Sequence, residues 1–293
     1  MTIGPEHEGP HRGSGDFHDS VLVEFSDAER GTFGVIQLTR IPGAPAASVL
    51  AILFVGGELA LRHLGTLAEL DVPRWDRAEA SGVRLETVEP LGRWIAAFTG
   101  ADAGFELEAT ATSAPIDLTE PSSASVARGA GVSRYEQFCE IRGEAKMNGK
   151  RQALDGVGRR VHEWRTPAPA TAGLVRSLYA ISKDESVAVT SVRPAGSAGH
   201  GDELAAAYVV TGDSPPTPFE DVRVSTIYDR QGVIRKAGLE LYMPGEEYPR
   251  RTSGVARGAT ILEDSGARRS ISFIEWSVRG APGQGSYQVI ARA

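Results

Sequence analysis

YEQFCEIRGEAKMNGKRQALDGVGRRVHEW, residues 135–164, is the stretch that decides the fold predicted for this chain. Two strand-like runs flank Asn148–Gly149, and an Asn–Gly pair is the strongest short-range signal for a two-residue hairpin turn. Such a turn places Met147 opposite Lys150, and the pairing of the other residues follows from that pair. The stretch therefore predicts a long antiparallel hairpin with a defined register.

One face of this hairpin gathers side chains that are suited to chemistry. Side chains alternate between the two faces of a strand, so the register groups Tyr135, Gln137, Arg160, His162 and Trp164. We expect this face to point into a barrel, with two glycines that make room for a ligand or mark a bulge: Gly156 and Gly158. We expect the opposite face to be solvated, and it carries Glu136, Glu140, Arg142, Glu144, Lys146, Arg151, Asp155 and Arg159.

Alternation with a period of two continues along much of the chain, as in AGFELEATAT (103–112). Strand candidates number about eight before Trp164 and about eight after it, and roughly eight strands close a barrel that holds one small ligand. We therefore predict an all-β fold of two successive lipocalin-like antiparallel β-barrels. The first covers residues 19–168 and the second residues 169–293, with the linker-like TPAPATAG (166–173) at the boundary. Residues 113–133 are expected to form a surface loop of the first barrel.

Composition excludes several classes of function. The chain has 293 residues and a net charge of −7, and no basic stripe alternates with aromatic residues, so we expect no nucleic-acid partner. One cysteine and six scattered histidines are too few for a closed zinc site. No glycine-rich phosphate loop follows a strand, so no nucleotide cofactor is expected. We predict that the protein needs neither a metal nor a cofactor.

The N-terminus has neither a cationic start nor an apolar run, so residues 1–18 are predicted to be a flexible tail and not a signal peptide. His7, His11 and His18 are expected to be solvated. The apolar run at 46–57 is shorter than the ~20 residues that a membrane-spanning helix needs. We therefore expect a cytoplasmic protein without stable membrane insertion. No feature of the sequence specifies an oligomeric state.

The central hairpin resembles the signature of the double-lipocalin superfamily that includes carotenoid hydratases and AttH-like proteins. The matching residues are Asp155, Gly156, Gly158, Arg160, His162 and Trp164, and two flanking stretches, 82–115 and 274–288, are also similar. The resemblance spans most of the chain, and it implies two lipocalin-like barrels with a pocket for an apolar small molecule. This chain departs from the pattern at Val161, Glu163 and Arg165, where the superfamily has Asp, Ser and Gly.

The resemblance leaves three functions open. The first is a cofactor-free cyclase of specialised metabolism that shapes a polyene polyketide or isoprenoid for ring closure, by a [4+2] Diels–Alder-type reaction. Orientation and a hydrogen bond to a carbonyl suffice for that chemistry, and Arg160, Gln137 or Tyr135 would donate the bond. The second is a hydratase or isomerase of an isoprenoid alkene, with Glu163 or another carboxylate as the acid. The third is a lipid carrier without catalysis.

Roles for the remaining candidates follow from residue type. We expect His162 to act with the catalytic group and Trp164 to form a flat apolar wall for substrate. Tyr179, Trp276 and Tyr287 are candidate pocket residues in the second half, and Trp276 also fits a core position, as do Trp75 and Trp94. Cys139 is interpreted as a small buried hydrophobe. A Ser–His–Asp hydrolase is disfavoured because no GxSxG motif occurs.

Overall fold

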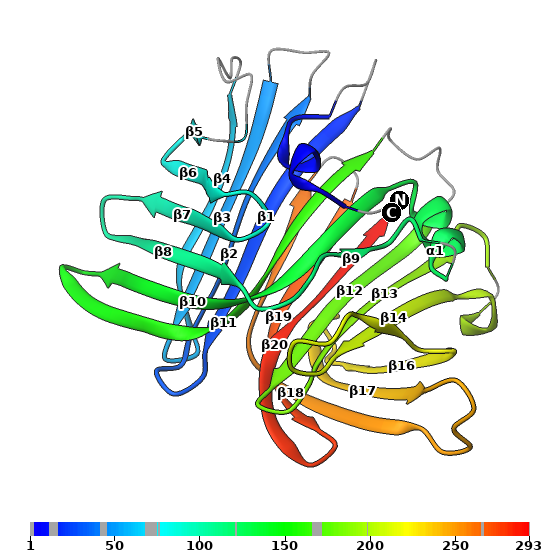
Figure 1. Cartoon of the computed structure of the whole chain (residues 1–293). Coiled ribbons are helices and arrows are strands. Elements are labelled where there is room, and N and C mark those ends of the chain that lie inside the picture. The colour runs from blue at the N-terminus through cyan, green and yellow to red at the C-terminus, as the bar shows by residue number, and fades with distance from the viewer. Residues whose placement is uncertain are drawn as a thin grey trace. The chain divides into compact units, whose positions relative to one another are not determined.

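The computed structural model describes residues 3–11, 17–41, 46–67, 75, 77–120, 122–165, 172–197, 199–264 and 267–292. Strands dominate this part of the chain and form two separate antiparallel sheets (Figure 1). Three short helices accompany them: η1 (Pro5–Glu8), α1 (Ala124–Ala130) and η2 (His200–Asp202). Within the described residues, no helix has the length and apolar character required to cross a bilayer. The all-β prediction is confirmed.

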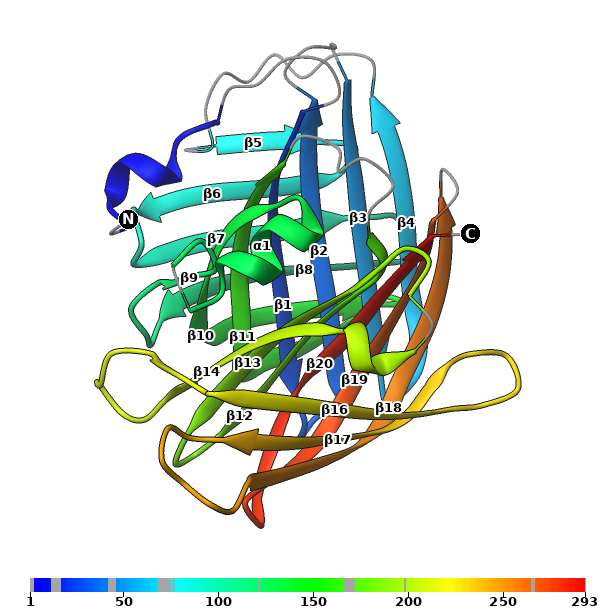
Figure 2. The same cartoon turned by 90° about the vertical axis from the view of Figure 1, so that its right-hand side faces the viewer.

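The first sheet is ordered β4-β3-β2-β1-β11-β10-β8-β7-β6-β5, and β9 pairs with β10. It curls so that β6 and β7 contact β2 across its interior, and Figure 2 shows β5–β8 running crosswise to β1–β4. Its strands are β1 (His18–Asp27), β2 (Thr32–Ile41), β3 (Ala46–Val55), β4 (Glu58–Leu67), β5 (Arg77–Ala80), β6 (Val83–Glu89), β7 (Arg93–Thr99), β8 (Ala103–Ala111), β9 (Ile116–Asp117), β10 (Ser133–Met147) and β11 (Lys150–Arg165).

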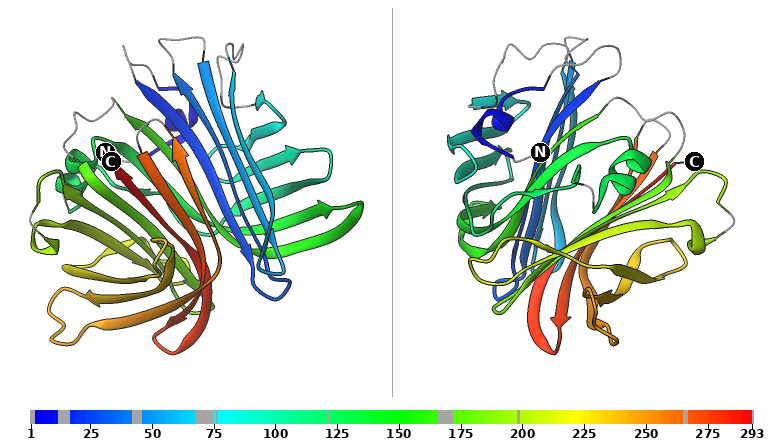
Figure 3. Two further views of the ribbon diagram at one scale, coloured as in Figure 1. Left: turned by 180° about the vertical axis from the view of Figure 1, so that it is seen from behind. Right: turned by 45° about the vertical axis from the view of Figure 1, so that its right-hand side comes forward.

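The second sheet is ordered β15-β14-β13-β12-β20-β19-β18-β17-β16. It also curls, because β16 at one edge contacts β14 near the other edge (Figure 3). Its strands are β12 (Ala172–Ser182), β13 (Ser186–Pro194), β14 (Leu204–Val210), β15 (Thr217–Pro218), β16 (Asp221–Tyr228), β17 (Ile234–Tyr242), β18 (Arg250–Asp264), β19 (Ala267–Val278) and β20 (Ala281–Arg292).

The chain divides into two compact units, each with its own apolar core. Unit 1 comprises residues 1–117 and 132–167, and unit 2 comprises residues 118–131 and 168–293. The division after residue 167 lies beside the expected boundary, although most of the predicted linker lies outside the described residues. Segment 118–131 differs from the prediction: it carries α1 and packs with unit 2, where Tyr208 donates a hydrogen bond to Ser123 Oγ at 2.8 Å.

The predicted register of the central hairpin is confirmed. Met147 pairs with Lys150, Gln137 with Arg160 and Tyr135 with His162. Asn148 and Gly149 have φ of 50° and 78°, the left-handed conformations that a two-residue hairpin turn requires.

The two glycines of β11 neither interrupt the ladder nor open a space for ligand. A Cβ on Gly156 would lie 2.2 Å from the carbonyl oxygen of Ser26, and one on Gly158 would lie 2.2 Å from that of Glu24. The glycines are therefore needed because the backbone of β1 passes very close to β11.

The predicted solvent face of the hairpin is exposed near the turn and buried at the other end. Glu140, Arg142 and Asp155 are exposed as expected, whereas Arg159 and Glu136 are 1% and 5% exposed. The expectation was wrong for these two because they neutralise each other. Arg159 donates to Glu136 at 3.0 Å and to Glu24 of β1 at 2.5 Å, and buried charges persist when they are paired in this way.

Candidate functional site

Tyr135, Arg160 and His162 lie together inside unit 1, on the face of the hairpin that was predicted to point inward. All three are almost completely buried. Neighbouring positions on the same face, such as Cys139 and Ile141, belong to the apolar core of the unit. A polar cluster therefore interrupts an apolar interior, where a hydrogen bond is electrostatically stronger than in water.

The hydroxyl of Tyr135 bridges the other two side chains. Arg160 Nη1 donates to Tyr135 Oη at 3.0 Å, and Tyr135 Oη lies 3.4 Å from Nδ1 of His162. On its other side, His162 Nε2 lies 2.8 Å from Oδ1 of Asp19. Because a carboxylate only accepts, Nε2 carries the proton and Nδ1 is free to accept from the tyrosine. Arg160 therefore donates to Tyr135 and His162 donates to Asp19, while the single phenol proton of Tyr135 faces both His162 and the carboxylate of Glu8.

Asp19 of β1 completes this chain and was not predicted from the sequence. Its Oδ2 accepts hydrogen bonds from Nε1 of Trp75 at 2.9 Å and from the backbone N–H of His11 at 3.0 Å. The available signal was its position in the strand. Asp19, Val21 and Val23 are two residues apart, so they share one face of β1, and the two valines face the core. An aspartate at a core-facing position of a strand indicates a buried partner.

Burial and hydrogen bonds shift the pKa values of these connected side chains in different directions. Burial lowers the pKa of His162, and the hydrogen bond to Asp19 offsets only part of this effect. For Asp19, burial would raise the pKa, but hydrogen bonds from His11 and His162 outweigh it and hold the pKa well below its usual range. Burial raises the pKa of Tyr135. At neutral pH the site therefore holds a neutral imidazole, an ionised Asp19 and an un-ionised phenol.

The N-terminal segment contributes to the site, contrary to the prediction of a flexible, solvated tail. Glu8 of η1 is buried, and its Oε2 accepts a hydrogen bond from Arg160 Nη2 at 2.5 Å. The ring of His11 stacks on Trp164, with centroids 3.6 Å apart and planes 6° apart. The expectation failed because both contacts join residues about 150 positions apart, which no local pattern reveals.

Arg160 and Trp94 line a small, partly enclosed cavity of unit 1. The guanidinium carbon of Arg160 lies 4.7 Å from the centre of the Trp94 ring, within cation–π distance. The cavity measures about 10 Å³, which is roughly the space of one water molecule. Two buried donors on these lining residues, Nε of Arg160 and Nε1 of Trp94, have no hydrogen-bond partner in the described part of the chain. The remaining wall is formed by Val21, Val23, Trp75, Leu85, Glu86, Thr87 and Ile95.

Gln137 and Glu163 are placed differently from the roles considered for them. Gln137 lies beside Arg160, but its Nε2 donates to the backbone oxygens of Leu91 and Ser113, each at 3.0 Å. Its N–H groups hold two loops and are not left for a substrate carbonyl. Glu163 alternates with His162, so it lies on the opposite face of β11. The structure therefore does not bring Glu163 to the cluster.

The candidate pocket residues of the second half lie in unit 2. Trp276 and Tyr287 belong to its apolar core, and Tyr287 Oη lies 2.8 Å from Oγ1 of Thr226. Tyr179 is buried on the other face of the sheet, because its cross-strand partner is Ser286 and not Tyr287. Cys139 is buried in the core of unit 1, and burial raises its pKa to about 12, so it is not a nucleophile.

His11, Asp19 and His162 are a grouping that the sequence spacing did not reveal. Each offers one ligand atom, and these atoms lie within 4.8 Å of one another, close enough for a metal ion. Asp19, however, already accepts hydrogen bonds from His162, Trp75 and the backbone of His11. We therefore assign the grouping to the hydrogen-bond chain and not to a metal centre.

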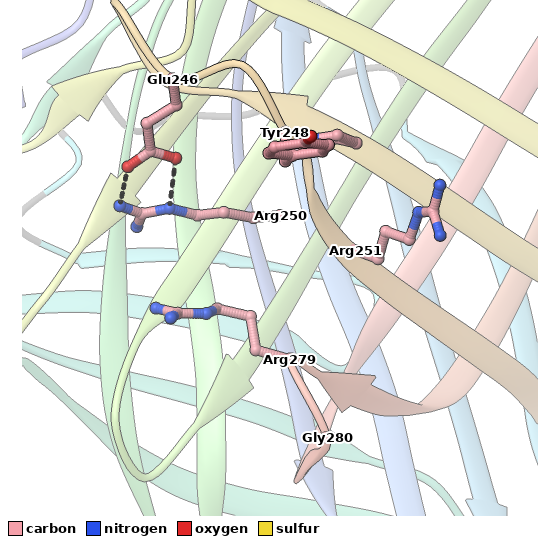
Figure 4. A pocket seen from close by; sticks show the side chains of 7 residues that line it. Glu246, Tyr248, Arg250, Arg251, Arg279 and Gly280 are labelled. Carbon is pink, nitrogen blue, oxygen red and sulfur yellow. Dashed lines mark hydrogen bonds and ion pairs between the residues drawn. The ribbon is translucent and has the colours of Figure 1, made fainter.

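Unit 2 has a larger but open hollow of about 580 Å³ at the start of β18 (Figure 4). Its arginines are already paired: Arg250 binds Glu246 at 3.1 Å and approaches Glu185, which also lies 3.6 Å from Arg279. Its aromatic side chain, Tyr248, is 76% exposed. Because these charges already satisfy one another, the small cavity of unit 1, which holds unpartnered donors, is the better candidate site.

A family model described as a domain of unknown function, DUF7064, matches residues 4–290 of the chain. None of the curated proteins matches the sequence.

Solved structures share the fold at low sequence identity. An AttH protein of Nitrosomonas europaea is 12% identical, with a TM-score of 0.68 over 94% of this chain and 92% of its own. CghA, solved with Sch210972, is 11% identical, with a TM-score of 0.64 over 94% and 88%. Kievitone hydratase from Nectria haematococca is 12% identical, with a TM-score of 0.64 over 94% and 89%. The predicted similarity to the double-lipocalin superfamily is confirmed for the fold.

Proposed function

This chain belongs to the DUF7064 family, and we propose that it is a cofactor-free cyclase that folds a long apolar polyene for ring closure. One observation carries the proposal: the lining residues Arg160 and Trp94 each keep a buried N–H without a partner among the described residues. Unsatisfied buried donors are costly, and a substrate carbonyl oxygen would satisfy them. The shared fold of a hydratase and of CghA supports an enzyme of this general kind.

The donors would act on the reacting molecule without exchanging a proton with it. In a [4+2] closure two new C–C σ bonds form at the expense of two π bonds, so no proton enters or leaves. A hydrogen bond to a conjugated carbonyl withdraws electron density from the alkene attached to it, and a buried, pre-oriented donor does this more effectively than water. The apolar wall at Val21 and Leu85 would hold the polyene substrate with its reacting carbon atoms close together.

The acid–base states of the cluster favour ring closure over hydration of an unactivated alkene. Alkene protonation requires a strong acid, whereas Tyr135 has a raised pKa and His162 is neutral. Hydration of a carbonyl-conjugated alkene is the second candidate, because Tyr135 can take a proton from water while its own proton passes to the neutral His162, which Asp19 holds in place. Asp19 orients the imidazole in this reaction and, because it is ionised, is not the acid that was sought at Glu163.

The test is product analysis on the full chain with a conjugated polyene that carries an acyl carbonyl, in ¹⁸O-labelled water. We expect a cyclised isomer of unchanged mass. Arg160→Lys should lower the rate by about 10²–10³, the cost of one lost oxyanion-type donor. Tyr135→Phe should lower it less, because the Tyr135 hydroxyl only positions Arg160 and His162. Leu85→Ala, which removes part of the apolar wall, should release side products because it loosens the pose of the substrate.

Tyr208→Phe is the matched control, since Tyr208 is also buried and bonded but belongs to unit 2. Incorporation of ¹⁸O, with complete loss in His162→Gln, would establish the hydratase instead. Tight binding without turnover would leave a carrier.

A further inference from the structure

The guanidinium of Arg160 is neutralised by the carboxylate of Glu8, near the N-terminus. Arg160 and Glu8 have side-chain exposures of 1% and 6%, and they form an ion pair at 2.5 Å. A buried cation that loses its anion is strongly destabilising. The position of the Glu8 carboxylate therefore demands an anionic oxygen group, whichever molecule supplies it.

A second donor belongs to the same position and comes from another element. The backbone N–H of Leu91, in the turn between β6 and β7, donates to Glu8 Oε1 at 3.1 Å. Leu91 has a φ of 57°, a left-handed conformation that costs energy for a residue with a side chain. Figure 2 shows the N-terminal helix beside this turn. One donor for each carboxylate oxygen, from two separate parts of unit 1, makes a built carboxylate receptor.

Within the described residues 3–11, few other contacts hold the segment that fills this receptor. Glu8 is the only buried residue of η1, and Glu6 on the same helix is exposed. Apolar burial, which anchors most terminal segments, is therefore missing from this helix. Its attachment depends on the pairs that Glu8 makes and on the contacts of His11 with Asp19 and Trp164. A free carboxylate can compete with such an anchor, because it offers the same charge in the same place.

We propose that Glu8 occupies the subsite for an acidic head group, so that the substrate is a long apolar carboxylic acid that displaces the N-terminal segment. This inference rests on the proposed function and names its substrate class. The cavity of about 10 Å³ is too small for a polyene while the segment is in place. The acid would take Nη2 of Arg160 and the N–H of Leu91, and Nε of the same guanidinium is left for a second carbonyl oxygen.

Binding of model ligands to the full chain tests the subsite apart from catalysis. The probes are decanoate, its methyl ester and decanol, measured by calorimetry. Glu8→Gln keeps the shape of the side chain but removes its charge, and Glu6→Ala is the matched control on the same helix. Removing a competing self-ligand raises apparent affinity by the inverse of the competent fraction, so we expect Glu8→Gln to bind decanoate roughly tenfold more tightly than wild type or Glu6→Ala. The ester and the alcohol should gain nothing.

A stability measurement covers the case in which the variant folds poorly. Glu8→Ala leaves a hole at Arg160, and sodium acetate should raise its melting temperature more than sodium chloride of equal concentration, with no such difference for Glu6→Ala. Equal decanoate affinity in Glu8→Gln and Glu6→Ala, equal binding of ester and acid, or the lack of an acetate effect would each overturn the subsite. Tight decanoate binding without turnover of any polyenoic acid would keep the subsite and refute the cyclase. Turnover of neutral polyenes without preference for acids would do the reverse.

Discussion

Arg159 and Arg160 are consecutive and equally buried, yet they serve opposite faces of one strand. Arg159 binds Glu24 and Glu136 on one face, and these carboxylates lie on strands of the same sheet. Arg160 binds Tyr135 and Glu8 on the other face, beside the small cavity. The first arginine therefore belongs to the architecture of unit 1 and the second to its candidate site.

Replacing Arg159 should reduce stability and leave ligand preference unchanged. Arg159→Met removes the guanidinium that two buried carboxylates share, which costs about 3–5 kcal/mol for a broken buried pair. Arg151→Met is the control, because its pair with Glu144 is exposed and such pairs contribute about 0–1 kcal/mol. Urea unfolding measures both. Equal losses in the two variants would contradict the assignment of Arg159.

Gly158→Ala should destabilise unit 1. The added Cβ would lie 2.2 Å from the carbonyl oxygen of Glu24, and a backbone atom cannot move aside without disturbing the β1–β11 pairing. Overpacking of this kind costs about 1–3 kcal/mol. Gly129→Ala in α1 is the control: its Cβ would meet only ordinary contacts at 3.5 Å, and alanine favours a helix by about 0.5–1 kcal/mol. An unchanged free energy of unfolding in Gly158→Ala would contradict the close approach of the β1 backbone to Gly158.

Stability should fall on acidification through the buried histidine. The pKa of His162 is lowered in the folded protein. In the unfolded chain His162 has its ordinary pKa of about 6.5 and is protonated below that pH. The unfolded state then binds more protons, so the free energy of unfolding rises with pH and falls as pH drops below about 6.5. The pKa of Asp19 is also lowered, so protonation of Asp19 at still lower pH reduces the free energy of unfolding further.

Urea titrations of wild type and His162→Gln between pH 7 and pH 5 measure this contribution. The wild-type slope should exceed that of the variant by up to about 1.4 kcal/mol per pH unit, the value for one proton. Asp19, Tyr135, His11 and Arg160 surround the imidazole and are unchanged in the variant. Identical slopes would show that the pKa of His162 does not change on folding and would contradict the lowered pKa.

Exhaustive chelation should leave melting temperature and activity unchanged. His11, Asp19 and His162 are close enough for a metal, but the carboxylate of Asp19 is already satisfied by three donors. Apo and zinc-supplemented samples should therefore melt together. A higher melting temperature with zinc in wild type, lost in His11→Ala, would instead assign a metal site.

Local chemistry in the sequence was enough to determine the central hairpin. A two-residue Asn148–Gly149 turn permits one register, and alternation then assigns each side chain to a face, so the grouping of Tyr135, Arg160 and His162 followed without tertiary information. The apolar patterns of residues 58–67 and 172–182, which form strands β4 and β12, do not by themselves separate helix from strand. Their pattern was ambiguous because short apolar runs suit both structures.

Only the tertiary structure decided which distant residues contact the hairpin face that carries Tyr135, Arg160 and His162. Glu8 and Asp19 reach Arg160 and His162 across more than 140 residues, because β1 pairs with β11 and brings the N-terminal segment with it. The same pairing gives Gly156 and Gly158 their role and buries Arg159, which alternation had assigned to solvent. Sequence periodicity reports which face of a strand is apolar, but a charge on either face becomes buried when a distant strand supplies its counter-charge. That long-range pairing, and not the hairpin by itself, makes a candidate site from the polar face.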